Sequence, residues 1–157
     1  MRFFTREWRQ GRGLPLDPER LLGLYATHLN SLTPPLPDHV RDLALGVDLH
    51  DAFLHELTLS PSSGELCLCL RAGDLERGYF DAALTYRGAA LSHGSEAMLS
   101  RASRTRDELL DHEFDGAPPH KWLHRFLFHE SGEVAIAFAD LTWTRVPKNG
   151  RFDGTAA

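Results

Sequence analysis

The spacing of apolar residues divides the chain into a helical first third and a strand-rich remainder. Asp17 is placed to cap a helix, Pro18 suits the first helical position, and Pro34 with Pro35 ends it. Apolar positions at helical spacing follow the cap: Leu21, Leu22, Tyr25, Ala26 and Leu29. The pattern therefore predicts a first helix that ends before the proline pair.

A second, shorter helix is predicted after the prolines. Asp38 is placed to cap it, and Gly46 is placed to end it. Its core-facing positions are Val40, Leu43, Ala44 and Val47. Upstream of both helices, Phe3 and Phe4 favour a short strand or an extended arm.

From Asp48 onward the apolar period changes towards two, which is typical of strands. The first of these segments is expected to place Phe53, His55, Leu57 and Leu59 on one apolar face. Six strands are predicted, at residues 53–59, 65–71, 79–86, 109–115, 122–129 and 134–143. Residues 95–106 favour a short helix or a loop. The fold class is therefore α+β, with two N-terminal helices packed on a mostly antiparallel sheet of about six strands.

The length and the composition indicate a single domain. A chain of 157 residues can bury about two thirds of its unfolded surface, and 42% hydrophobic and 25% charged residues are ordinary for a globular protein. We expect one domain over residues 1–146 and a flexible tail over 147–157, where apolar periodicity is absent.

Charge and targeting signals exclude several function classes. A formal net charge of -5 argues against general binding of nucleic acid or of an anionic membrane. No signal-peptide core and no membrane-length apolar stretch is found, so a cytoplasmic protein is expected. Cys67 and Cys69 alternate with leucines along one strand, an arrangement poorly oriented for a disulfide, so reduced thiols are predicted.

The densest run of imidazole and carboxylate groups spans residues 48–56. A ligand set for a divalent transition metal would comprise His50, Asp51, His55, His112 and His124, if the later strands bring the last two histidines close. In the alternative interpretation, which we favour, the aspartates form turns and the histidines make hydrogen bonds in partly buried positions. No zinc-protease, P-loop or dinucleotide motif is present, and no cofactor is expected beyond that possible metal.

Two charged segments are candidate partner-binding surfaces. Asp111 and Glu113 alternate with Asp115 onto one strand face, which predicts either a binding surface or pairing with arginines such as Arg125. Arg101 and Arg104 lie in the strongest basic run, which suits an acidic partner or a solvated loop.

The two ends of the chain resemble an uncharacterised bacterial protein family. The resemblance rests on the start, Met1 to Trp8 (MRFFTREW), and on three closing segments at residues 113–115, 124–128 and 138–141. The family has no established activity to carry over. The His50-Asp51 pair ahead of a long strand is also similar to a pattern in small bacterial immunity-type proteins, which act by binding a cognate toxin.

The sequence therefore favours a small cytoplasmic protein-binding module, with an immunity-like protein as one version of it, over an enzyme. The alternative is a metal-dependent enzyme that uses the cluster at residues 48–56.

Overall fold

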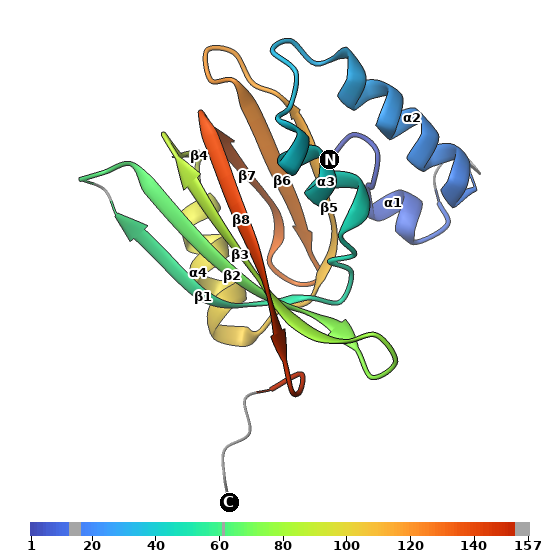
Figure 1. Ribbon diagram of the computed structural model, residues 1–157, viewed down its shortest axis with the longest axis vertical. Helices are drawn as coiled ribbons and strands as arrows, with labels where there is room; N and C mark the ends of the chain where they lie inside the picture. The colour runs from blue at the N-terminus through green and yellow to red at the C-terminus, as the bar shows by residue number, and fades with distance from the viewer. Residues whose placement is uncertain (13–16, 61, 153–157) are drawn as a thin grey trace, which may run out of the picture.

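The strands form two sheets that lie as layers, and the helices lie at the edges of these layers (Figure 1). The computed structural model describes residues 1–12, 17–60 and 62–152. Within these ranges the helices are α1 (Arg6–Arg9), α2 (Pro18–Ser31), α3 (Asp38–Gly46) and α4 (Ser95–Thr105). The strands are β1 (Phe53–Ser60), β2 (Glu65–Asp74), β3 (Gly78–Arg87), β4 (Ala90–Leu91), β5 (Leu109–Gly116), β6 (Trp122–Phe128), β7 (Gly132–Phe138) and β8 (Asp140–Lys148).

The strands form two antiparallel sheets. The first sheet has the order β1-β2-β3-β8 and the second has the order β4-β7-β6-β5. The hydrophobic core lies between them, where Tyr86 of the first sheet packs edge-on against Phe138 of the second at 5.4 Å between ring centroids. The predicted α+β class and antiparallel pairing are confirmed, whereas the single sheet of about six strands is wrong.

The difference arises at Ala139, where the chain passes from one sheet to the other. The predicted strand at residues 134–143 is in fact β7 followed by β8. Val134, Ile136 and Phe138 are buried in alternation, but the next buried residue is Leu141, three positions later. This shift in parity turns β8 away from the second sheet, so that it pairs with β3 instead.

The two predicted N-terminal helices are present as α2 and α3. The Asp17 carboxylate caps α2 by accepting a hydrogen bond from the Arg20 amide at 2.9 Å. Asp38, predicted as the cap of α3, is instead its first helical residue. The cap position belongs to Pro37, whose carbonyl accepts from the amides of Val40 and Arg41.

Further helices cover other parts of the sheets. Residues 95–106, predicted as helix or loop, form α4, which packs against β1 and β7. Of the two predictions for the N-terminus, no strand forms: residues 1–5 are neither helix nor strand, and Phe3 and Phe4 pack on Tyr25 of α2 at 5.3 and 5.1 Å between centroids. α3 packs against β8 and β5. None of the helices in the described ranges combines the length and the apolar character needed to cross a bilayer.

A bulge in β1 changes which side chains face the core. Leu54 pairs with Leu70 and Glu56 pairs with Cys69, so His55 is the extra residue. Because of this irregularity Leu54 is fully buried and Leu57 packs against the core, whereas Leu59 remains 36% exposed. The predicted single apolar face through Phe53, His55, Leu57 and Leu59 is therefore wrong, because periodicity alone assumes an unbroken strand.

Part of the predicted tail, residues 147–157, packs against the first sheet. Pro147 and Lys148 belong to β8, and Phe152 stacks on Phe53 at 5.4 Å between centroids. Arg71 donates to the carbonyls of Gly150 and Arg151 at 3.1 and 3.3 Å. Residues 153–157 lie outside the described residues.

Two glycines provide a matched test of the backbone. Gly73 has a φ of +98°, and a Cβ there would lie 2.1 Å from the Gly78 carbonyl oxygen, whereas Gly23 in α2 has open space around it. We expect Gly73→Ala to lower the free energy of unfolding by about 1–3 kcal/mol. Gly23→Ala should raise it by about 0.5–1 kcal/mol, because alanine favours the helix. Urea denaturation measures both, and equal effects would contradict the strained geometry at Gly73.

Candidate functional site

A cavity opens at the junction of α3 and β1, between the N-terminal helices and β5. Its volume is about 400 Å³, within the range of small-molecule sites. We call it the junction pocket. Its apolar wall comprises Phe4, Trp8, Pro18, Leu22, Ala44, Leu45, Val47 and Leu49. Its polar wall comprises Arg9, Asp48, His50, Asp111 and His112.

The loop between α3 and β1 is held in place by local hydrogen bonds. The Asp48 carboxylate accepts from the His50 amide at 3.0 Å, which forms a side-chain turn. Asp51 takes the left-handed conformation, with a φ of 59°, and its amide donates to the Leu109 carbonyl at 2.9 Å. The loop is therefore anchored to the start of β5, and Asp48 is fixed at the pocket.

One side of the polar wall is an ion pair. The Arg9 guanidinium donates twice to Asp111, at 2.5 Å from Nε and 2.9 Å from Nη2. Burial raises the pKa of Asp111, and the pairing offsets only part of that effect. The hydrogen bond to Asp111 in turn raises the pKa of Arg9. The predicted partner-binding residue Asp111 is thus already paired within the chain.

A chain of hydrogen bonds runs from the pocket into the core. His112 and His124 lie 3.0 Å apart between Nδ1 and Nε2, and His124 Nδ1 lies 2.7 Å from the Tyr86 hydroxyl. His112 also hydrogen-bonds to the backbone of Val47. One assignment satisfies every group: Tyr86 donates to His124, His124 donates to His112, and His112 donates to Val47, with both imidazoles neutral.

Burial holds both imidazoles in that neutral state. Desolvation lowers the pKa of His112 to about 4 and lowers the pKa of His124 well below its ordinary value. In this arrangement the lone-pair nitrogen of each ring accepts a hydrogen bond. Neither ring therefore has a free nitrogen for a metal.

The five predicted metal ligands do not meet as one set. His50 lies at the rim of the junction pocket, with Nδ1 2.9 Å from the Leu110 carbonyl and Nε2 3.3 Å from Asp51. His112 and His124 belong to the buried chain just described. The two sheets enclose the core between them, and His55 lies on the surface of the first sheet that faces away from this core. Of the favoured alternative, the turn at Asp48 and the hydrogen bonds of His50 and His55 are present, but His50 is exposed rather than partly buried.

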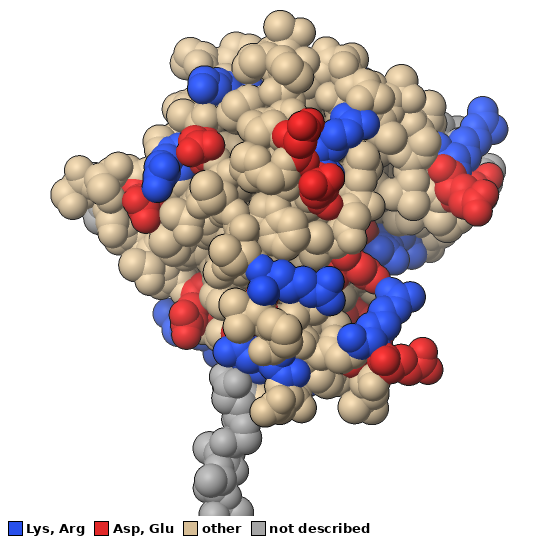
Figure 2. Space-filling view, viewed as in Figure 1, with Lys and Arg blue, Asp and Glu red and all other residues tan. Residues whose placement is uncertain are grey.

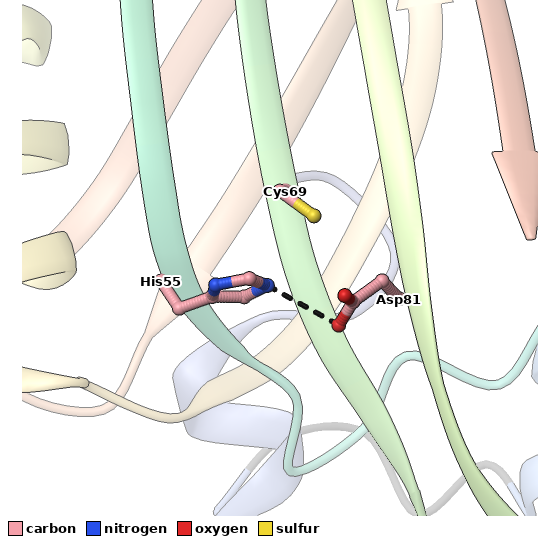
Figure 3. A group of neighbouring side chains, drawn as sticks. All are labelled: His55, Cys69 and Asp81. Atoms are coloured by element: carbon pink, nitrogen blue, oxygen red, sulfur yellow. Dashed lines mark hydrogen bonds and ion pairs between the residues drawn. The ribbon is translucent and has the colours of Figure 1, made fainter. Parts of the chain in front are cut away.

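His55 instead lies beside two residues that the sequence analysis did not select. His55, Cys69 and Asp81 come from three adjacent strands, and their potential ligand atoms all lie within 4.8 Å of one another (Figure 3). The sequence predicts Cys69 on the face of a strand without a ligand role. For Asp81, the signal in the sequence is that it is a single carboxylate within the apolar segment that forms β3. Their proximity depends on the register of β1, β2 and β3.

Basic residues surround Asp81. Arg71 donates to Oδ1 at 2.5 Å, and Lys148 lies 3.0 Å from Oδ2. Burial acts to raise the pKa of Asp81, but these hydrogen bonds outweigh it and lower that pKa. Burial, with Asp81 as a second cause, raises the pKa of the Cys69 thiol to about 11.

Glu113, the second predicted partner-binding carboxylate, is buried, with 1% of its surface exposed. It accepts from the amides of Arg2, Phe3 and Phe4 at 2.5, 2.9 and 3.3 Å. Arg125 donates to it at 3.4 Å, and the pairing that the sequence allowed is thus present. An exposed binding surface at Glu113 is therefore excluded, because the N-terminal segment covers it.

The basic candidates lie on α4. The Arg101 side chain is 56% exposed and lies 3.9 Å from Glu130, and Arg104 is exposed in the last turn. On the face shown in Figure 2, acidic and basic side chains are interspersed, without a continuous patch of one sign. The face in Figure 2 therefore carries no broad basic surface.

Comparison with known proteins gives no match to a family model, to a curated protein or to a solved structure. The described residues form an α+β domain of two antiparallel sheets with an amphipathic cavity at the junction of α3 and β1.

Proposed function

We propose that the protein is a binding module whose junction pocket receives an apolar group that carries a positively charged amine. The observation that supports this proposal is the combination of an aromatic and aliphatic wall with a carboxylate, Asp48, at the rim. Exposed apolar side chains at the rim, Leu22 at 48% and Leu45 at 41%, are typical of an interaction site.

The charges of the lining favour a cation over an anion. Arg9 is neutralised by its bidentate pair with Asp111. His112 is neutral near pH 7 because its pKa is lowered to about 4. Asp48 makes one longer contact, 3.6 Å to the exposed Arg77, which solvent screens. The remaining charge at the rim is therefore negative.

A pair of small probes tests the charge preference. 2-Phenylethylamine and 3-phenylpropionate present the same ring and spacer with opposite charges. We expect the amine to bind about fivefold more tightly, since a surface charge pair contributes about 1 kcal/mol. Isothermal titration calorimetry measures both affinities, and the indole NMR signal of Trp8 reports contact with the pocket wall.

Matched variants assign the preference to the pocket. Asp48→Asn should remove the preference for the amine, whereas Asp42→Asn, the same change on an exposed part of α3, should preserve it. Leu45→Trp at the rim should weaken both probes. Equal affinity of the two probes for the natural protein, or an unchanged preference in Asp48→Asn, would contradict the proposal.

The amine can belong to a free molecule, or to a lysine or the N-terminus of a partner protein. In the second case the protein would be the protein-binding module expected from the sequence. Phenylalanine amide and a peptide with an N-terminal phenylalanine share the chemistry and separate the two sources. Tighter binding of the peptide indicates a protein partner, and equal binding indicates a small molecule.

A further inference from the structure

The outer surface of the first sheet carries three potential metal ligands of different kinds. His55 lies at the bulge of β1, Cys69 in β2 and Asp81 in β3, and antiparallel pairing joins these three adjacent strands. The three side chains point towards a common centre in Figure 3. Because a paired sheet is rigid, the arrangement depends little on loop conformation.

The distances suit a tetrahedral ion. His55 Nε2 and Asp81 Oδ1 are 3.2 Å apart. Bonds of about 2.0–2.2 Å from a zinc ion to nitrogen and oxygen imply an edge of about 3.3 Å between those two ligands. The sulfur of Cys69 lies within 4.8 Å of both, so a side-chain rotation closes the remaining gap.

The donor types also narrow the choice of ion. Thiolate and imidazole ligands favour Zn²⁺ and related transition ions over Mg²⁺ or Ca²⁺, which prefer oxygen. Three protein ligands leave a fourth position for water, as in zinc sites that are open to solvent. Both Cys67 and Cys69 are free thiols.

The surroundings of Asp81 resemble the support that metal ligands receive. Arg71 is 2% exposed, and its guanidinium orients the carboxylate while it also binds the carbonyls of Gly150 and Arg151. The positive charge of Lys148 disfavours a metal cation beside Asp81. The Lys148 side chain is 33% exposed, however, so it can turn to solvent when a cation binds. Glu56, paired with Cys69 across the strands, adds a compensating negative charge nearby.

We propose that His55, Cys69 and Asp81 bind one divalent transition ion of the Zn²⁺ type. When the bond from sulfur to the ion forms, the thiol proton leaves to solvent and no redox step occurs. The site is separate from the junction pocket, and the proposal does not depend on that pocket's function.

Cobalt titration of the metal-free, full-length protein tests this site. Co²⁺ replaces Zn²⁺ and gives a thiolate-to-cobalt absorption band in the near ultraviolet together with visible bands of a tetrahedral ion. We expect saturation at one equivalent and bleaching when Zn²⁺ is added. Absence of a thiolate band at stoichiometric cobalt would overturn the proposal.

Matched variants identify the ligands. Cys69→Ser should abolish the thiolate band, whereas Cys67→Ser, two residues away on the same strand, should retain it. His55→Ala and Asp81→Asn should each lower the affinity for cobalt by more than about 100-fold. Loss of a residue that only supports a ligand typically costs roughly 10- to 100-fold in metal affinity. Lys148→Ala should tighten binding, because an opposing charge is removed.

Controls separate this site from folding and from the junction pocket. Far-ultraviolet circular dichroism confirms that each variant is folded before titration. Asp48→Asn should bind cobalt as the natural protein does. The metal site can therefore be tested even if the junction pocket binds neither probe. An unchanged thiolate band in Cys69→Ser, or loss of the band in Cys67→Ser, would assign the metal to other residues and overturn the proposal.

Discussion

At pH 5 the protein should have a free energy of unfolding about 4 kcal/mol lower than at pH 7, because the buried His124 and the partly buried His112 are neutral in the folded state. Desolvation lowers the pKa of His112 to about 4 and lowers the pKa of His124 well below its ordinary value. In the unfolded chain both should titrate near the ordinary value of about 6.5. The unfolded chain therefore binds more protons than the folded chain, and the difference grows to about two protons at pH 5.

The sign follows from that difference in bound protons. More protons on the unfolded chain mean that stability rises with pH, by about 1.4 kcal/mol per pH unit for each group. The stabilising contribution is complete above about pH 6.5 and is lost as the pH falls towards 4. Asp81, Asp107 and Asp115 have lowered pKa values, so they lose their contributions only below the ordinary range of aspartate. Asp111, with its raised pKa, acts weakly in the opposite direction.

Urea denaturation at intervals between pH 5 and pH 7 measures the slope. A His124→Met variant should have about half of the natural slope, whatever its absolute stability, because one titrating group is removed. His50→Gln, a change at an exposed histidine, should leave the slope unchanged. A natural protein with constant stability across this range would show that the two imidazoles are not held neutral.

Glu113→Ala should lower the free energy of unfolding by about 3 kcal/mol. The buried carboxylate accepts hydrogen bonds from three consecutive backbone amides, and hydrogen bonds to charged groups contribute about 1.5–3 kcal/mol each. The loss is smaller than their sum, because the freed amides of Arg2, Phe3 and Phe4 can reach water once the N-terminal segment detaches. Glu113→Gln, which retains one acceptor oxygen, should lose less.

Two measurements separate this effect from a general loss of stability. Urea denaturation gives the free energy, and Glu76→Ala, a change at an exposed glutamate, should stay within about 0.5 kcal/mol of the natural protein. Hydrogen exchange should show faster exchange at the amides of residues 2–4 in Glu113→Ala. If those amides exchange as in the natural protein, Glu113 does not hold the segment.

Local patterns in the sequence correctly indicated several parts of the fold. The Asp17 cap and the strands of the β1-β2-β3 meander depend on residues close in sequence, and their hydrophobic periods predict them well. For residues 95–106 the sequence left helix and loop open, and the structure forms a helix there. In each case the deciding interactions lie within one element or across one tight turn.

The division into two sheets was not predicted, although a signal was present. The buried positions change parity between Phe138 and Leu141, and this change marks where the chain leaves the second sheet. The bulge at His55 had no comparable signal, because cross-strand pairing with β2 creates it. Both features belong to partners that are distant in sequence.

For function, the segment that the sequence singled out, residues 48–56, contributes Asp48, Leu49 and His50 to the wall of the junction pocket. The sequence by itself also determined which chemical groups are present. Only the tertiary structure decided their roles: the fold buries His124 and partly buries His112, the N-terminal segment covers Glu113, and strand register brings Cys69 and Asp81 to His55. Composition and spacing show which kinds of side chains are present. Burial and neighbouring groups determine whether those side chains are charged and what they contact, and both arise from contacts between distant parts of the chain.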